Sequence, residues 1–466
     1  GPYRGVFVMH TDLTGIFLMK KLLLVSLFLL VSFNASAQVT NKDGSIVNGV
    51  LTASFDPFAS FSAEPFAPFP ASLFFQTSTD LTIDLPVPDP NDVLDPAVAL
   101  NSMDGFSTTE KWITSFAMGD AGAFDNAVPG SIDPTSVVPG WSVRVFKVTT
   151  SRFLFVTGVE RELMPNVEFT ALSTPSGQVV IVPLQPLEPY SDYMAVLTND
   201  IRDTRGNDAT PDRTYYLGQA DSPWIDSNGK STNLLLDDAS AAATELVRQI
   251  INTMETAAAS AGVVRDDIVL SWTVHTQSTA PVLGALRATA QPAPTQIAPT
   301  GLTTAAAGGF GLADIYMGVI TMPYYGGIPS AENPAALLTD FWKATPGAYL
   351  PPFDQLGLDP TSTNLSIANR FPVMTGMQTV PLLITVPNAM SGASMPAEGW
   401  PVVLFMHGLT RNRTDALAIA DAMAQAGHVV ISMDGALHGV VPDVEPHLAP
   451  FYIENTPFAP IANERT

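Results

Sequence analysis

Residues 401–435 constrain the fold of this chain more than any other stretch. Residues 401–406 form a continuous apolar run, which is typical of a strand buried on both faces. A His-Gly turn follows, residues 414–424 carry apolar side chains at helical spacing, and Gly427 marks the end of that helix. A second apolar run at 428–433 completes a strand–helix–strand unit, so we expect its two strands to pair in parallel.

The N-terminal part of the chain has a different pattern, in which short alternating stretches are separated by turn residues. Such spacing predicts a β-rich domain of the Ig-like sandwich type, with strands at 141–148, 179–182, 193–197 and 269–276. One amphipathic helix is expected at 237–261, ended by Gly262. Its apolar stripe indicates packing against a core rather than a ligand-binding surface.

The N-terminal end carries the pattern of an export signal. Two lysines and a short apolar run precede an Ala-Ser-Ala sequence at residues 35–37. This order predicts a cleavable signal peptide at 19–37 and a mature start at Gln38, and hence a secreted, cell-surface or periplasmic protein. A membrane anchor is disfavoured because a spanning helix needs about 20 apolar residues. We expect residues 1–18 to be extra upstream sequence.

A Pro-, Ala- and Thr-rich stretch at 291–304 predicts a linker between two domains. The first domain is then expected at 38–290 and the second at 305–466. A glycine-rich sequence at 308–311 follows the predicted linker, but no strand precedes it and one glycine of the dinucleotide fingerprint is missing. It predicts a loop, and no cofactor is expected.

Composition excludes several classes of function. The chain has no cysteine, which rules out disulfides, thiolate metal sites and cysteine nucleophiles. It holds 21 basic and 44 acidic residues, a net charge of −23. Such a field repels nucleic acid, so we expect no nucleic-acid partner.

The candidate chemistry lies in the turn after the first strand of the strand–helix–strand unit. Acyl transfer places negative charge on a carbonyl oxygen, and fixed backbone N–H donors must stand where that oxyanion forms. His407 and Gly408 begin such a turn, and Gly408 lets the backbone approach a substrate and tolerates a positive φ. The predicted donors are the backbone N–H groups of Leu409 and Thr410. The alternative is an ordinary strand-to-helix turn of any doubly wound protein.

Two regions carry a family resemblance. The strings at 404–416 and 433–439 resemble the α/β-hydrolase region of bacterial virulence-factor lipases, which are surface or secreted lysophospholipase-like enzymes. The stretch from Phe55-Asp56-Pro57 to the Asp-Gly-Phe-Ser-Thr-Thr sequence at 104–109 resembles the N-terminal domain of the same family. The resemblance implies a mixed fold, with a β-rich N-terminal domain followed by the first part of an α/β-hydrolase fold.

The resemblance also implies a serine nucleophile in a Gly-x-Ser-x-Gly elbow, but no serine of this chain is flanked in that way. In the hydrolase order the nucleophile, the acid and the histidine follow one another along the chain. We therefore expect all three to lie beyond Thr466, and residues 1–466 alone to be an inactive fragment. The family can also carry a lipid-attached N-terminal cysteine, which this chain lacks.

Two further histidines have candidate roles. His438 follows the second strand of the unit, near the expected mouth of the active site, and is a candidate lining residue of the substrate cleft. Asp434 and His438 make a weak metal pair because a third ligand is missing, so no metal is expected. His275 lies within a predicted strand, where a lone histidine is usually structural.

Two functions remain open from the sequence. The first is a secreted carboxylic-ester hydrolase (a lipase, esterase or lysophospholipase) that acts on lipid or acyl-ester substrates, with the outer-membrane surface as a candidate partner. The second is a non-catalytic cell-surface or adhesion protein with Ig-like sheets and a degenerate hydrolase domain. A Gly-x-Ser-x-Gly motif in the gene beyond residue 466 favours the first.

Overall fold

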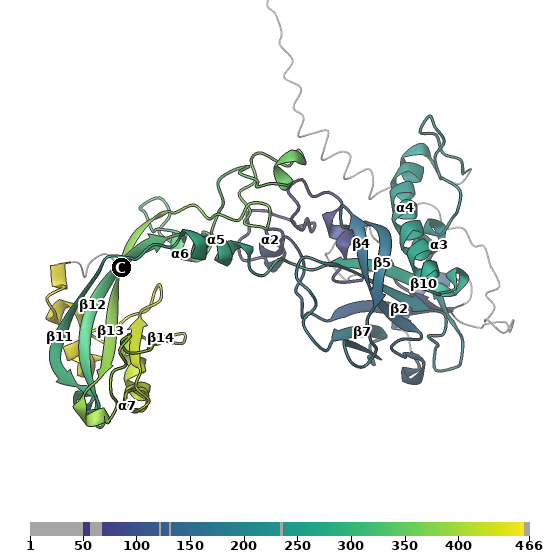
Figure 1. Cartoon of the computed structure of the whole chain (residues 1–466). Coiled ribbons are helices and arrows are strands. Elements are labelled where there is room, and N and C mark those ends of the chain that lie inside the picture. Colours follow the sequence, from purple (N-terminus) through teal and green to yellow (C-terminus); the bar gives the residue numbers. More distant parts are fainter. Residues whose placement is uncertain (1–49, 56–67, 121–122, 130–131, 234–235, 461–466) are drawn as a thin grey trace, which may run out of the picture. The chain divides into compact units, whose positions relative to one another are not determined.

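The computed structural model describes residues 50–55, 68–120, 123–129, 132–233 and 236–460 (Figure 1). The predicted upstream sequence and signal peptide lie outside the described residues. The chain divides into two compact units. Unit 1 runs to Pro281 and includes Tyr349–Ala368, and unit 2 comprises Val282–Ala348 and the chain from Asn369 onward.

Unit 1 contains two sheets. The first has the order β6-β7-β2-β1-β9, with β3 paired to β2. All its neighbours are antiparallel except β1 and β9, which are parallel. Its strands are β1 (Val50–Ala53), β2 (Trp112–Asp120), β3 (Ala123–Pro129), β6 (Phe169–Ser173), β7 (Gln178–Pro183) and β9 (Ala209–Pro211).

The second sheet of unit 1 is antiparallel with the order β10-β8-β4-β5. Its strands are β4 (Val143–Ser151), β5 (Phe155–Glu162), β8 (Asp192–Thr198) and β10 (Ile268–His275). All eight residues of β10 are buried. Trp112 of the first sheet packs against Tyr193 and Trp272 of the second, with ring centroids 6.5 and 6.4 Å apart, so the two sheets share one core.

The predicted helix is α4 (Asp238–Ser260), which packs against α3, β5 and β10. The Asp237 side chain caps its N-terminus by accepting from Ser240 N–H at 2.7 Å, which satisfies one of the free N–H groups of the first turn. Gly262, just past the end, has a φ of +82°. Unit 1 is therefore mixed and sheet-rich, and its Ig-like character stays a prediction.

Short helices complete the described residues. In unit 1 they are η2 (Ser72–Phe75), α2 (Pro96–Leu100), η3 (Pro134–Ser136), α3 (Arg213–Gly218), η4 (Arg265–Asp267) and η6 (Phe353–Gln355). Those assigned chiefly to unit 2 are α5 (Pro281–Thr289), η5 (Thr304–Ala307), α6 (Ala336–Thr339), η7 (Ala389–Ser391), η8 (Arg413–Ala416), η9 (Pro446–Phe451) and η10 (Ile453–Asn455). No helix among the described residues is long and apolar enough to cross a bilayer.

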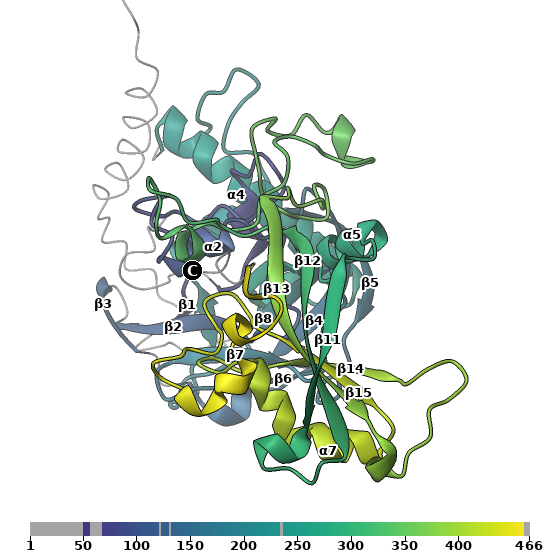
Figure 2. The same cartoon turned by 90° about the vertical axis from the view of Figure 1, so that its left-hand side faces the viewer.

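Unit 2 is built on one sheet with the order β11-β12-β13-β15-β14 (Figure 2). Its strands are β11 (Thr295–Thr303), β12 (Ala313–Tyr324), β13 (Gly376–Pro387), β14 (Val402–Met406) and β15 (Val429–Met433). Only β14 and β15 pair in parallel among these neighbours, and α7 (Leu417–Gln425) connects them. The predicted strand–helix–strand unit with parallel pairing is confirmed.

Two local predictions are wrong. The stretch at 291–304 is not a linker, because residues 295–303 form β11 and pair with β12 along its length. An edge strand tolerates Pro299, and the pairing shifts register between Pro299 and Leu302, next to Gly301 with a φ of +73°. The two units divide at Pro281 instead.

The prediction that residues 401–406 form a strand buried on both faces is also wrong. Within the described residues β14 is the edge strand of its sheet, and its neighbour is β15. Val402, Leu404 and Met406 are 53%, 73% and 61% exposed. An apolar run identifies a strand but carries no information on what covers it, so burial depends on the neighbours that the tertiary structure supplies.

Candidate functional site

The predicted site lies where β14 and β15 end. Parallel neighbours bring their carboxyl ends to the same edge of a sheet, the place where open α/β sheets bind ligands. The turn at 407–410 follows β14 and the loop at 434–438 follows β15. Figure 2 shows the two strands side by side. The structure therefore brings together the predicted site residues, as the sequence predicts for adjacent parallel strands. They are His407, Gly408, Leu409, Thr410 and His438.

Two histidines tie the two loops to each other. His407 Nε2 accepts a hydrogen bond from Gly435 N–H at 2.9 Å, and His438 Nε2 accepts one from Thr410 N–H at 3.0 Å. Each residue of the pair thus reaches the loop of the opposite strand. Their rings lie 4.9 Å apart between centroids.

The hydrogen-bond partners of the ring nitrogens indicate the same tautomer for both rings. His407 Nδ1 lies 2.8 Å from Gly408 O, and His438 Nδ1 lies 2.7 Å from Ala436 O. A carbonyl oxygen only accepts, so each Nδ1 carries the hydrogen, and each Nε2 is left as the acceptor. Both imidazoles therefore act as backbone clamps between the two loops.

The residue of the turn with a left-handed backbone conformation is Thr410 and not Gly408. Thr410 has a φ of +63°, a left-handed conformation that is unusual for a β-branched residue. Gly408 has no positive φ, and a Cβ placed on it meets nothing within 4 Å. The expectation that Gly408 supplies the special backbone conformation is wrong. Strain of this kind tends to be stored at functional sites.

The two predicted oxyanion donors differ in availability. Thr410 N–H is already engaged by His438 Nε2. Leu409 is 85% exposed, and its N–H makes no hydrogen bond to any described residue. Of the two predicted donors, Leu409 N–H is therefore the one without a hydrogen-bond partner among the described residues.

A buried ion pair connects the segment after the turn to the loop that follows β15. Arg413, at the start of η8, donates from Nη1 to Asp434 Oδ2 and from its backbone N–H to Asp434 Oδ1, the latter at 2.7 Å. Arg413 Nη2 also donates to Phe451 O at 2.6 Å. Both side chains are almost fully buried. No sequence pattern predicts this pair, because Arg413 and Asp434 stand 21 residues apart in unrelated local patterns.

Metal binding has no support at this site. Asp434 is committed to Arg413, and both ring nitrogens of His438 have hydrogen-bond partners. The described part of the chain holds no group of three or more His, Asp or Glu side chains placed to bind a metal ion.

His275 lies in unit 1, in a buried aromatic setting. Its Nδ1 is 2.7 Å from Asp192 Oδ1, and its ring stacks on Phe153 at 4.0 Å. Tyr190 meets the same ring edge-on at 4.7 Å. With 1% of its surface exposed, His275 cannot reach a substrate, which agrees with a structural role.

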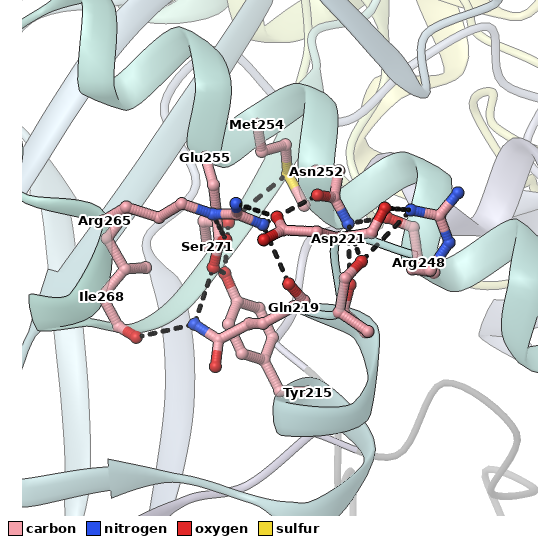
Figure 3. Close-up of polar contacts among 12 residues, drawn as sticks. Tyr215, Gln219, Asp221, Arg248, Asn252, Met254, Glu255, Arg265, Ile268 and Ser271 are labelled. Carbon is pink, nitrogen blue, oxygen red and sulfur yellow. Dashed lines mark hydrogen bonds and ion pairs between the residues drawn. The ribbon is translucent and has the colours of Figure 1, made fainter. Parts of the chain in front are cut away.

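A second polar cluster of unit 1 surrounds Glu255 of α4 (Figure 3). Its carboxylate accepts from Arg265 Nε at 2.8 Å, Gln219 Nε2 at 2.8 Å and Tyr215 Oη at 3.2 Å. Burial raises the pKa of Glu255, and the Arg265 and Gln219 hydrogen bonds oppose that rise. The cluster joins α3, α4 and η4, and Glu255 is fully buried within it, which agrees with a structural role.

Part of the chain matches a known protein family. A family model described as the bacterial virulence factor lipase N-terminal domain matches residues 71–304, half of the chain. The match includes the stretch at 104–109 and ends before the turn at 407–410. No curated protein and no solved structure matches the chain. The chain belongs to the bacterial virulence factor lipase N-terminal family.

Proposed function

We propose that this chain is part of a secreted carboxylic-ester hydrolase that acts on lipid acyl esters, as a lipase, esterase or lysophospholipase. Membership of a lipase-associated family supports the general class. The observation that carries the proposal is the N–H of the largely exposed Leu409, after the carboxyl end of β14, which has no hydrogen-bond partner among the described residues. In acyl transfer such a donor stabilises the oxyanion that forms when a nucleophile attacks the ester carbonyl.

In this proposal the turn at 407–410 supplies the oxyanion side of the site. The histidine clamps and the Arg413–Asp434 pair hold the donor in place before substrate arrives, which is what electrostatic preorganisation requires. The reaction also needs a serine nucleophile, and residues 1–466 contain no Gly-x-Ser-x-Gly elbow. The test therefore compares the protein expressed from its complete gene with residues 38–466.

The decisive variant removes the backbone donor of Leu409. Leu409→Pro eliminates the N–H, and Leu409→Ala is the matched control because it removes the same side chain but keeps the donor. In the complete gene product, Leu409→Pro should lower kcat on a short-chain chromogenic ester by about a hundred- to a thousand-fold, and Leu409→Ala should change it little. Residues 38–466 alone should show no enzymatic turnover.

Two results overturn the proposal. Equal activity of folded Leu409→Pro and Leu409→Ala proteins removes this turn from the active site. A folded, exported product of the complete gene that hydrolyses no ester favours the non-catalytic cell-surface protein instead. Export itself is tested by N-terminal sequencing of secreted material, which should begin at Gln38.

A further inference from the structure

Unit 1 exposes five large apolar side chains on three neighbouring turns. They are Val138, Trp141, Met164, Val167 and Leu184, each between 41% and 66% exposed, and we call them the three-turn patch. Single exposed apolar residues are common on protein surfaces and need no explanation. Larger groups of exposed apolar side chains, in contrast, mark interaction surfaces.

The three turns are in direct contact. A Cβ added to Gly140 would lie 2.7 Å from Pro165 Cγ, so the first two turns touch. Leu184 N–H donates to Glu168 O at 2.8 Å, and Gln185 Nε2 donates to Val167 O at 3.3 Å, which joins the second and third turns. The turns precede β4, connect β5 to β6 and follow β7, so both sheets of unit 1 contribute.

The patch is also held rigidly. Trp141 N–H donates to Val138 O at 3.1 Å and Val167 N–H donates to Met164 O at 3.3 Å, so the first two turns close on themselves. Pro139, Pro165 and Pro183 restrict the backbone of all three turns. A surface ordered in advance loses little conformational entropy when it binds.

The local charge differs from that of the whole chain. Residues 138–188 carry four basic and four acidic side chains, a net charge of zero in a chain of net charge −23. Three of the basic residues form ion pairs with acidic neighbours: Arg144 with Glu162, Arg161 with Glu168, and Lys147 with Glu160 and Glu188. An uncharged apolar patch matches a zwitterionic lipid surface, whereas the acidic remainder repels an anionic one.

We propose that the three-turn patch inserts into the interface of a zwitterionic lipid surface and docks the protein there. The choice of a lipid surface rests on the proposed function, because an enzyme acting on lipid esters must reach an interface. Tryptophan favours the boundary between headgroups and acyl chains, and the aliphatic side chains gain by burial below it.

The test is co-flotation of the complete gene product with phosphatidylcholine vesicles. The variant Trp141→Ser/Met164→Ser should bind about tenfold more weakly or worse, since it removes two large apolar groups from the interface. Leu94→Ser, which changes an 85% exposed residue of unit 1 outside the patch, is the matched control and should float like wild type. Adding phosphatidylglycerol to the vesicles should weaken binding at low salt.

Tryptophan fluorescence gives a second readout. Vesicles should shift the wild-type emission to the blue, and Trp141→Phe should lose most of that shift while it still floats. No flotation of wild type, or equal flotation of the double variant, overturns the proposal. If sedimentation shows a dimer for the wild type but not for the double variant, the patch binds a second copy of the chain. That result also overturns the proposal. Turnover of a water-soluble short-chain ester, measured in parallel, should be unchanged by the double variant, so failure of docking and failure of ester hydrolysis are read separately.

Discussion

The backbone N–H of Thr410 donates to Nε2 of His438 at 3.0 Å, and this bond joins the loops after two parallel strands. It reduces the two predicted oxyanion donors to one, because a donor bound to an imidazole is not available to a substrate oxygen. It also makes His438 a clamp between the two loops, while the lining of a substrate cleft by His438 stays a prediction.

Removing that acceptor should loosen the turn. We expect His438→Ala to lower the free energy of unfolding by about 1 kcal/mol and to speed amide hydrogen exchange at Thr410, because one hydrogen bond between the loops is lost. His428→Ala is the control, since the one side-chain hydrogen bond that His428 makes among the described residues joins it to Ala426 O in its own turn, at 2.9 Å. Equal exchange at Thr410 in both variants contradicts the clamp.

A substitution at the strained residue Thr410 should raise the free energy of unfolding, whereas a substitution at Gly408 should change it little. A left-handed conformation costs an ordinary residue about 1–2 kcal/mol. Thr410→Gly should therefore raise the free energy of unfolding by about 1 kcal/mol after the extra entropy of glycine is subtracted. Gly408→Ala should change it by less than about 1 kcal/mol, because the new Cβ meets open space. Urea denaturation measures both, and a destabilised Thr410→Gly protein argues against strain.

Gly105 of the family-matched stretch should tolerate no side chain. A Cβ there would lie 2.4 Å from Gln277 N, a backbone atom that cannot move aside, so Gly105→Ala should cost about 3 kcal/mol. The comparison is Gly284→Ala in α5, where the Cβ meets nothing within 4 Å. That change should stabilise by up to about 1 kcal/mol through helix propensity. Similar thermal unfolding of the two variants contradicts the steric argument.

Glu245 should make unit 1 sensitive to acid. Arg248, followed by Gln249 and Trp224 N–H, lowers the pKa of Glu245 from 4.5 to about 2. A lowered folded-state pKa stabilises above the unfolded value, so this contribution is complete above pH 4.5 and is lost as the pH falls toward 2. Glu245→Gln should cost about 2 kcal/mol at neutral pH and flatten the pH dependence of stability in that range.

The control for acid sensitivity is Glu398→Gln. Glu398 is exposed and makes no ion pair with any described residue. Its replacement should leave the pH dependence of urea unfolding unchanged. A Glu245→Gln protein with the wild-type slope between pH 4.5 and 2 rules out Glu245 as the source.

Local sequence determined the elements whose signals are themselves local. The helix at 238–260 follows from an apolar stripe, an aspartate cap at Asp237 and Gly262 beyond the end. The parallel pairing of β14 and β15 follows from the short helical connection between them. This pairing also brings His407 and His438 together, because two neighbouring parallel strands end at the same edge of the sheet.

Tertiary structure decided what depends on partners distant along the chain. Proline and threonine at 295–303 suit a linker and an edge strand equally, and only pairing with β12 makes β11. The exposure of Leu404 depends on which strands flank β14. The residue type alone does not show it, because a leucine can stand in an edge strand or in a buried strand. Thr410 lies 28 residues from the histidine that binds its N–H, and its positive φ has no signature in its own side chain. Every residue type except proline has a backbone N–H, so the sequence does not show which of these donors is free. Only the contact between the two loops leaves Leu409 N–H without a partner among the described residues and engages Thr410 N–H.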